Sequence, residues 1–452
     1  METYNDSFYY MVESTSRNSA EEVVPLVLEL LSPKRMIDVG CGIGTWLSVF
    51  KEHGVEEIIG VDGGWVDSNR LKIPAENFLV ANLEEPLPIE QKFDLVVSLE
   101  VAEHLYSEKA EVFLDSLEKL GSACLFSAAI CQQGGVHHVN EQWPEYWIKR
   151  FQDRGYVVID CLRKKIWNNT KVAWWYKQNL FLFVKSYCLK NYPLLQRELI
   201  NNSLQHSLIH PELFVSKCSQ KGSCQSLAFS DNITRHPYPE SFYREVQHTS
   251  RQSAQQVVPL VMKFLQPKTL IDVGCGLGSW LSVFREHGVE DVCGVDGEWI
   301  DQKILEIPDH FLVANLEEPL LIDRQFDLVV SLAVAERIPI DKKDIFIDSL
   351  VKLGKVCLFS AAIPYQGGFN NCNEQWQDYW VQSFHERGFI VVDCLRKLVW
   401  NNQNVAPWFS QNMLLFVEEK FLHDYPVLQE ECQRQQTSQL SIVHPTFYLA
   451  RC

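Results

Sequence analysis

The feature that most constrains the fold is that one domain-sized sequence occurs twice in the chain. IDVGCGIGTW at residues 37–46 returns as IDVGCGLGSW at residues 271–280, so that Asp38 corresponds to Asp272. The correspondence continues over most of each half of the chain. A repeat of this length encodes tandem domains rather than a solenoid of short repeats.

The region between the copies is rich in small and polar residues, which is typical of a linker. We predict a first domain over residues 1–217, a linker over residues 218–234 and a second domain over residues 235–452. Each copy is long enough to bury its own hydrophobic core.

Composition excludes several classes of protein. The 452 residues are 46% hydrophobic and 22% charged, which is typical of a globular chain rather than a disordered one. The formal net charge of −17 argues against nonspecific binding to nucleic acid. No apolar run approaches the roughly 18–20 residues that cross a bilayer, and the N-terminus does not have the pattern of a secretory signal. We therefore expect a cytoplasmic protein with neither a nucleic-acid nor a membrane partner.

Strand-like and helix-like patterns alternate in the first copy. Strands are predicted at 35–40, 57–62, 77–82, 93–99, 123–130, 156–163 and 179–185. Amphipathic helices are predicted at 45–54, 107–121 and 144–155. This alternation predicts an α/β domain with a mostly parallel sheet that is covered on both faces, and the two late strands would form an antiparallel hairpin.

The repeated glycine segment is predicted to be a strand-to-helix turn. In the first copy its glycines are Gly40, Gly42 and Gly44, which lets the backbone turn sharply and approach a ligand. A helix that starts at Thr45 would direct its free N–H groups at the same place. Ligands of such sheets bind beyond the carboxyl ends of the strands. Asp62, at the end of the next strand, is placed to bind ribose hydroxyls.

The spacing of this turn separates two classes of cofactor. A dinucleotide turn has the pattern G-x-G-x-x-G/A, whereas here an acid precedes glycines that alternate with single residues. The acid-x-G-x-G-x-G turn, the acid that ends the second strand and FDLVVSLEVAEHL at 93–105 together resemble class I S-adenosylmethionine-dependent methyltransferases. The resemblance implies S-adenosylmethionine as the cofactor, and two tandem Rossmann-like domains. Each would be a doubly wound, seven-stranded, mostly parallel sheet with an antiparallel last strand.

The resemblance also implies which residues hold the cofactor. The acid and the glycines would hold its methionine end, Asp62 its ribose, and Asn82 would lie near adenine. The expected residues in the first copy are Asp38, Gly40, Cys41, Gly42, Gly44, Asp62, Asn82, Leu83 and Glu100. In the second copy they are Asp272, Gly274, Gly276, Gly278, Asp296 and Asn315.

Three histidines follow strands on the same rim and are candidate catalytic residues. His104 follows the fourth strand, and His137 and His138 follow the fifth. Methyl transfer to a hydroxyl requires the loss of a proton, and an imidazole titrates near neutral pH. We expect O-methylation of a small-molecule or sugar-like acceptor by base-assisted, in-line methyl transfer in the first domain.

Glu100, Glu103 and His104 permit a different assignment. Their E-x-x-E-H spacing is similar to that of ubiquinone-pathway O-methyltransferases, in which it implies a divalent ion. The interpretation we favour from sequence has no metal ligands: Glu100 contacts the cofactor and Glu103 caps the next helix.

The second copy keeps the cofactor residues but not the reactive ones. Ala333 stands at the position of Glu100 and Arg337 at that of His104, while Asn370 and Asn371 replace both later histidines. Neither arginine nor asparagine can act as a base near neutral pH. We expect the second domain to bind cofactor or to regulate, with little turnover. A non-catalytic regulatory protein that binds S-adenosylmethionine is the alternative for the whole chain.

Aromatic residues crowd the segment 143–176. Some must belong to the core, and others are expected to line the acceptor pocket. The basic run Arg163-Lys164-Lys165 is expected to be a solvated strand end.

Overall fold

The computed structural model describes residues 6–200, 205–220, 240–434 and 439–451. The chain divides into two compact units, residues 1–213 and 214–451, which we call the first and second domains. Residues 221–234 of the predicted linker lie outside the described residues, and its first three residues end helix α8 (Pro211–Gln220).

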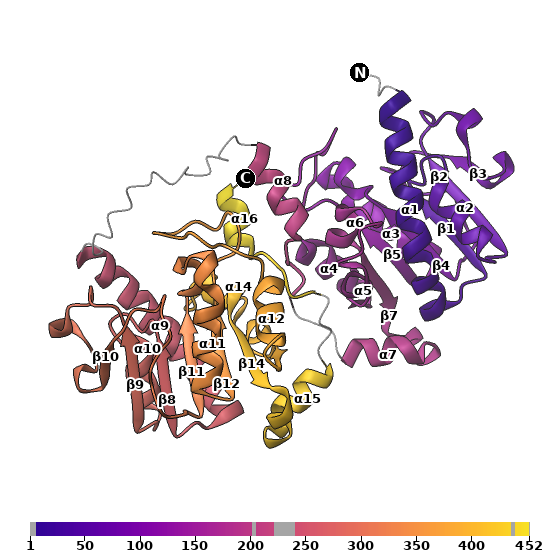
Figure 1. The fold of residues 1–452 in the computed structure, drawn as a ribbon. Coiled ribbons are helices and arrows are strands. Elements are labelled where there is room, and N and C mark those ends of the chain that lie inside the picture. The colour runs from indigo at the N-terminus through magenta and orange to yellow at the C-terminus, as the bar shows by residue number, and fades with distance from the viewer. Residues whose placement is uncertain (1–5, 201–204, 221–239, 435–438, 452) are drawn as a thin grey trace. The chain divides into compact units, whose positions relative to one another are not determined.

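The first domain alternates strands and helices in the predicted order (Figure 1). Its strands are β1 (Arg35–Val39), β2 (Glu57–Asp62), β3 (Phe78–Val80), β4 (Leu95–Leu99), β5 (Ala123–Ser127), β6 (Tyr156–Ile159) and β7 (Phe181–Lys185). Its helices are α1 (Asp6–Leu31), α2 (Thr45–Glu52), α3 (Ala110–Leu120), α4 (Pro144–Asp153), α5 (Leu162–Ile166), α6 (Trp174–Asn179) and α7 (Pro193–Ile200).

The seven strands form one sheet with the order β3-β2-β1-β4-β5-β7-β6. The pairs from β3 to β5 are parallel, with Asp38 opposite Gly60 and Val97 opposite Leu125. Strand β7 is antiparallel to both of its neighbours, β5 and β6. The last strand therefore inserts between β5 and the edge strand β6.

Two apolar layers cover the two faces of this sheet, which makes the fold doubly wound. One layer contains Val23 and Val27 of α1 and Phe50 of α2, packed with β-strand residues such as Leu95. The other contains residues of α3 and α4, packed with alternate strand residues such as Val96. Because successive side chains of a strand point to opposite faces, neighbours Leu95 and Val96 belong to different layers.

The second domain repeats the architecture. Its strands are β8 (Thr269–Val273), β9 (Asp291–Asp296), β10 (Phe311–Val313), β11 (Leu328–Leu332), β12 (Val356–Ser360), β13 (Phe389–Val392) and β14 (Leu414–Glu418). Their order is β10-β9-β8-β11-β12-β14-β13, and β14 is antiparallel to both of its neighbours. The helices are α9 (Glu240–Leu265), α10 (Ser279–Glu286), α11 (Lys343–Leu353), α12 (Gln377–His385), α13 (Arg396–Val399), α14 (Pro407–Asn412), α15 (Pro426–Arg434) and α16 (Pro445–Arg451).

The predicted fold class is confirmed in both domains: each has seven strands, a parallel majority and an antiparallel last strand. Helix α2 begins at Thr45, as the glycine turn predicts, and ends two residues earlier than expected. None of the helices in the described ranges is both long enough and apolar enough to span a bilayer.

Candidate active site

In each domain the glycine turn is fastened to the end of the second strand. The carboxylate of Asp62 accepts hydrogen bonds from the backbone N–H groups of Gly42 (2.7 Å) and Gly63 (2.6 Å). In the second domain Asp296 accepts from Gly276 (2.8 Å) and Gly297 (2.7 Å). Both predicted ribose-binding acids are thereby held beside the turn.

The glycines of the turn serve different purposes. Gly40 has φ 85°, and a β-carbon there would overlap the side chain of Val101, so this glycine lets the loop after β4 approach the turn. Gly42 also has positive φ, 54°, but a β-carbon there would meet no atom within 4 Å. The missing side chain at Gly42 therefore leaves open space that no other described part of the protein fills. Gly276 has the same property in the second domain.

Asp38, in β1 beside this turn, is a buried acid. Asp38 is 3% exposed, and its carboxylate makes no hydrogen bond within the described residues. Burial raises its pKa well above the ordinary value, and the charge of Asp62 raises it further. Asp272 repeats the same burial and shift. A buried carboxylate without a donor leaves an acceptor for a ligand group.

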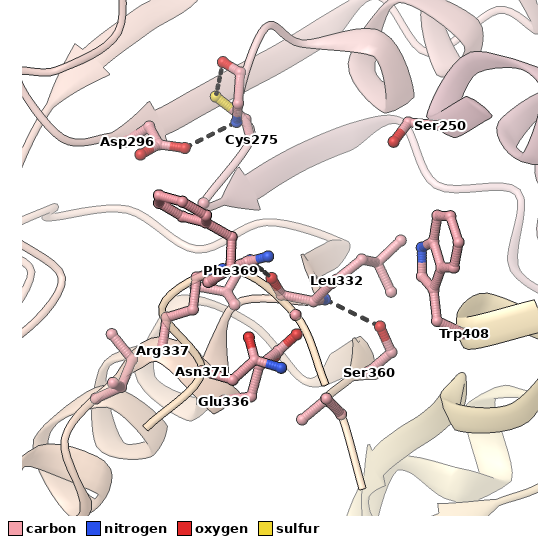
Figure 2. Close-up of a pocket in the computed structure, with 18 of the residues that line it drawn as sticks. Ser250, Cys275, Asp296, Leu332, Glu336, Arg337, Ser360, Phe369, Asn371 and Trp408 are labelled. Atoms are coloured by element: carbon pink, nitrogen blue, oxygen red, sulfur yellow. Dashed lines mark hydrogen bonds between the residues drawn. The ribbon is translucent and has the colours of Figure 1, made fainter. Parts of the chain in front are cut away.

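A cavity of about 570 Å³ opens at this edge of the second domain's sheet (Figure 2). This volume lies in the range of small-molecule sites. The cavity brings together most of the residues predicted to bind cofactor in this domain: Asp272, Gly274, Gly276, Asp296 and Asn315.

In the first domain, three other residues predicted to bind cofactor lie just after strands β1 and β3. Asn82 uses its side-chain oxygen to accept from the N–H of Glu84 (3.1 Å), which fixes the turn after β3. Leu83 is buried in the apolar layer that contains Val61. Cys41 lies half-buried in the turn, where burial raises the pKa of its thiol. The cofactor roles of these residues stay predictions.

The loops after β4 and β5 are joined at Glu103. Its carbonyl oxygen accepts from the N–H groups of Val139 (2.9 Å) and Asn140 (3.0 Å). The connection places His138 beside the short 3₁₀ turn Ala102–His104, with the rings of His104 and His138 perpendicular and 4.9 Å apart.

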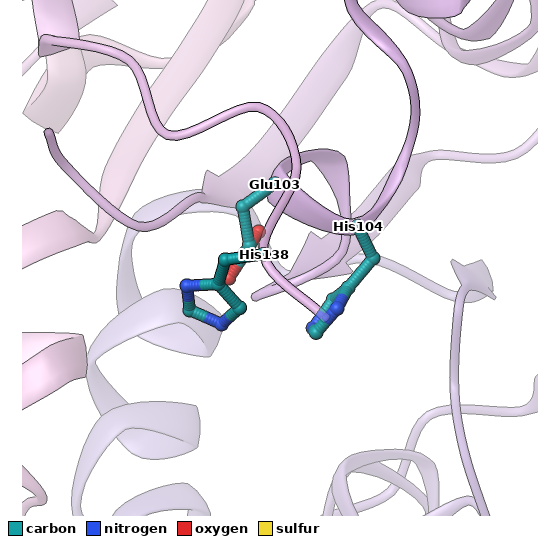
Figure 3. Close-up of side chains that lie close together, drawn as sticks. All are labelled: Glu103, His104 and His138. Carbon is teal, nitrogen blue, oxygen red and sulfur yellow. The ribbon is translucent and has the colours of Figure 1, made fainter. Parts of the chain in front are cut away.

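The Glu103 carboxylate lies against these two imidazoles (Figure 3). One potential ligand atom each from Glu103, His104 and His138 lies within 4.8 Å of the others. Glu103 is 0% exposed, and neither carboxylate oxygen has a hydrogen-bond partner. Burial raises its pKa well above the ordinary value, and the charge of Glu100 raises it further. The expectation that Glu103 caps the next helix is wrong, because the N-cap positions of the next 3₁₀ turn and of α3 are Tyr106 and Lys109.

His104 and His137 lie differently from His138. The Nδ1 atom of His104 is 3.3 Å from the carbonyl oxygen of His137. Burial lowers the pKa of His104, and the charge of His138 lowers it further. His137 has φ 61°, and its imidazole is exposed and is not one of the three grouped side chains. Its catalytic role stays a prediction.

Glu100 belongs to a hydrogen-bonded group whose other members, Gln133 and Asn179, were not predicted from the sequence. Asn179, at the end of α6, donates to Glu100 (3.1 Å) and to the side-chain oxygen of Gln133 (3.0 Å). Burial raises the pKa of Glu100 to about 7, although hydrogen bonds from Ser127 and Asn179 oppose the shift. One signal could have identified these partners: Gln133 and Asn179 are both kept in the second copy, as Gln366 and Asn412.

The corresponding rim of the second domain has a different charge pattern. Glu336 is retained and buried, with its Oε2 atom unpaired. Arg337 donates to the carbonyl oxygens of Ala333 and Phe369. Asn371 takes the place of His138. This rim therefore keeps the glutamate that corresponds to Glu103 but has no histidine at the positions of His104 and His138.

The aromatic segment of the first domain contains the predicted core residues, and the pocket-lining role of the others stays a prediction. Trp147, Trp167 and Tyr176 are buried, whereas Trp174 and Trp175 are half-buried. The expectation of a solvated strand end is wrong for Arg163, which lies in helix α5, is 0% exposed and pairs with Asp160, whereas Lys165 of the same run is exposed. The Arg163 guanidinium supports the fold from inside.

A family model described as a methyltransferase domain matches residues 11–160 and 246–361, together more than half of the chain. The chain belongs to the methyltransferase domain family. Both matched regions contain the acid-and-glycine turn, and membership of this family supports S-adenosylmethionine as the cofactor.

Two curated relatives are both named ubiquinone biosynthesis O-methyltransferase. The protein of Rhodopseudomonas palustris (strain BisB18) is 29% identical over 165 residues, 31% of this chain and 59% of that protein. The protein of Bradyrhizobium sp. (strain ORS 278) is 27% identical over 168 residues, 32% of this chain and 61% of that protein. The chain thus spans about three fifths of the length of these relatives.

Two solved structures that match part of the chain are named as methyltransferases. One is magnesium protoporphyrin IX methyltransferase from Synechocystis PCC 6803 with bound SAH, at 17% identity and TM-score 0.30, covering 39% of this chain and 86% of that one. Another is the methyltransferase domain of bacterial CtHen1-C, at 20% identity and TM-score 0.29, covering 37% of this chain and 97% of that one.

Proposed function

We propose that the first domain transfers a methyl group from S-adenosylmethionine to a hydroxyl oxygen of a small-molecule acceptor, with a divalent cation held by Glu103, His104 and His138. The observation that carries this proposal is the buried Glu103 carboxylate, which lacks a hydrogen-bond partner and lies against two imidazoles. The name that the curated relatives share supports an oxygen as the methylated atom.

The cofactor fits the residues at the glycine turn. The open space at Gly42 accommodates the methionine part of the ligand, which a side chain there would displace. Asp38 offers a buried acceptor to the ammonium group, and the lone pairs of Asp62 that remain face the ribose hydroxyls.

The donor set also fits a cation. One carboxylate and two neutral imidazoles suit Zn²⁺ or another divalent transition metal, with remaining positions open to the acceptor or water. An unpaired buried carboxylate costs several kcal/mol unless a cation or a donor compensates it. A bound cation would polarise the acceptor hydroxyl and lower its pKa.

Residues of the chain can then take up the proton that the reaction releases. An O–CH₃ bond forms as the S–CH₃ bond breaks, the sulfonium becomes a neutral thioether, and the hydroxyl proton must leave. Glu100, held by Asn179 and with a pKa raised to about 7, is suited to accept that proton near neutral pH. Alignment of the acceptor with the methyl group supplies a further part of the rate enhancement.

Base catalysis without a cation is a second candidate, which the hydrogen bond between His138 and Glu141 favours. The Nδ1 atom of His138 lies 2.9 Å from the Glu141 carboxylate. A carboxylate behind an imidazole orients the ring, so His138 could remove the proton itself.

For the second domain we propose cofactor binding with little turnover. Its turn and acids match those of the first domain, whereas the positions of Glu100, His104 and His138 hold Ala333, Arg337 and Asn371. The acceptor of the first domain is expected to be a phenolic or sugar-like hydroxyl compound, because the half-buried Trp174 and Trp175 of α6 offer flat faces.

The test is isotope transfer from labelled S-adenosylmethionine by the full chain, with catechol and methyl glucoside as acceptors. Treatment with EDTA should abolish transfer, and Zn²⁺ or Mn²⁺ should restore it. Glu103→Gln should lower turnover by roughly 10²–10³-fold, because the cation's charge stabilisation is worth several kcal/mol. The control Glu56→Gln changes an exposed carboxylate of the same domain and should have no effect. Transfer that is unaffected by EDTA would favour the base-only candidate, and no transfer under any condition would refute both.

A further inference from the structure

The cavity of the second domain extends beyond the residues predicted to hold cofactor. Its lining also includes three aromatic side chains: Phe369 from the loop after β12, Trp408 from α14 and Phe447 from α16. Aromatic faces of this kind bind planar groups by stacking and by burial of apolar area. These side chains therefore suit a second ligand with a flat, apolar body.

Arg337 adds a positive charge to the wall of this cavity. Its Nη1 atom donates to the carbonyl oxygen of Ala333 and its Nε atom to that of Phe369 at 3.3 Å. Within the described part of the chain, no carboxylate forms a salt bridge with Arg337. Because two backbone carbonyls hold the guanidinium in place, its remaining N–H groups are preorganised for an anionic ligand, and a carboxylate matches their planar geometry.

The same wall offers two unused hydrogen-bond acceptors. Glu336 is 3% exposed and its Oε2 atom has no partner, although the residue lines the cavity. The Oδ1 atom of Asn371 is likewise buried and unpaired, while its Nδ2 atom donates to Glu374. Figure 2 shows Glu336, Arg337 and Asn371 on one side of the cavity, with Trp408 across from them. A ligand hydroxyl would satisfy one of the two acceptors, and leaving such atoms unpaired is costly.

We propose that the second domain binds a hydroxylated aromatic carboxylate beside the cofactor, without a metal ion. The ring lies among the aromatic side chains, the carboxylate pairs with Arg337, and the hydroxyl donates to Glu336 or Asn371. Arg337 supplies at this position the positive charge that a bound cation would supply in the first domain. The inference rests on the proposed function only in taking the second domain as a binding domain rather than a methylating one.

The test uses 3-hydroxybenzoate as the probe and the full chain, treated with EDTA and saturated with SAH. Binding is measured by isothermal titration calorimetry. The carboxylate should bind about 10–150-fold more tightly than the neutral 3-hydroxybenzamide, because a hydrogen bond to a charged group is lost with the amide. Benzoate, which lacks the hydroxyl, should bind about 2–10-fold more weakly than 3-hydroxybenzoate.

Two matched variants locate the site. Arg337→Gln should remove the preference for the carboxylate over the amide, whereas Arg324→Gln should keep it, because Arg324 pairs with Asp291 on the surface of the same domain. Equal binding of carboxylate and amide by the unmodified chain would overturn the inference, and so would an unchanged preference in Arg337→Gln. This test measures binding, and methyl transfer is measured separately. A chain that binds 3-hydroxybenzoate in the presence of EDTA but never transfers a methyl group would refute the proposed function and leave this inference standing.

Discussion

The Nδ1 atom of His138 lies 2.9 Å from a carboxylate oxygen of Glu141, and the same oxygen accepts the backbone N–H of Gly134 at 2.6 Å. Because Nδ1 is engaged with an acceptor, Nε2 is the nitrogen left with a free lone pair in the neutral ring. Glu141 thus leaves Nε2 as the nitrogen of His138 that is available to a ligand.

The first prediction concerns this orientation. Glu141→Ala should weaken Zn²⁺ binding to the full chain by about 10–100-fold, the usual loss when the carboxylate behind a metal-bound histidine is removed. Competition with a chromogenic chelator measures this affinity. The control is Glu374→Ala, which removes the corresponding carboxylate behind Asn371 in the second domain. Equal loss in both variants, or no loss in Glu141→Ala, would show that His138 is not oriented for a cation.

The second prediction concerns the space that His138 occupies. A β-carbon on Gly135 would overlap the Nε2 end of the His138 ring. Gly135→Ala should therefore move the ring and lower Zn²⁺ affinity and turnover together, while the free energy of unfolding changes by about 1 kcal/mol or less, as at surface sites. Gly64→Ala is the control, because a β-carbon there makes only an ordinary contact with Val80. A large loss of stability, or unchanged Zn²⁺ affinity, would contradict this account of Gly135.

These residues also show how far sequence reasoning reaches. The turn from Asp38 to Thr45 could be predicted because its acid, glycines and helix start are neighbours in the chain. Asn179 is signalled only by its retention in the second copy, because its partner Glu100 lies 79 residues away in the sequence. The pairing of Glu141 with His138 could not be predicted, because it depends on the conformation of the loop after β5. The burial of Glu103 has the same origin: its position in sequence suits a cap, but the joined loops close over its side chain.

The third prediction is a pH dependence of stability that centres on His210. Its Nε2 atom lies 2.9 Å from the Trp167 carbonyl oxygen and its Nδ1 atom accepts the N–H of Glu212, an arrangement that requires the neutral ring. Burial lowers the pKa of His210 to about 4. Since the folded-state pKa lies below the unfolded value of roughly 6.5, this stabilisation is complete above about pH 6.5 and is lost as the pH falls toward 4.

At pH 5 the loss should reach about 2 kcal/mol relative to pH 7. Urea unfolding monitored by circular dichroism at both pH values measures it. His210→Gln should be less stable at pH 7 but should lack this part of the pH dependence. His53→Gln, which changes a histidine at the end of α2, is the control. The same pH slope in His210→Gln and the unmodified chain would exclude His210 as the source.

The fourth prediction tests the division of roles between the domains with one matched pair of variants. Gly42 and Gly276 both have positive φ and both adjoin open space, so asparagine, which tolerates this backbone conformation, should fold there and fill the cofactor site. Each of Gly42→Asn and Gly276→Asn should lower SAH binding from two molecules per chain to one.

Isotope transfer from labelled S-adenosylmethionine by these two variants is the most direct measurement of the central claim. The account predicts that Gly42→Asn abolishes transfer to the acceptor and that Gly276→Asn retains it. Transfer that survives Gly42→Asn and disappears in Gly276→Asn would place the reaction in the second domain and contradict the account.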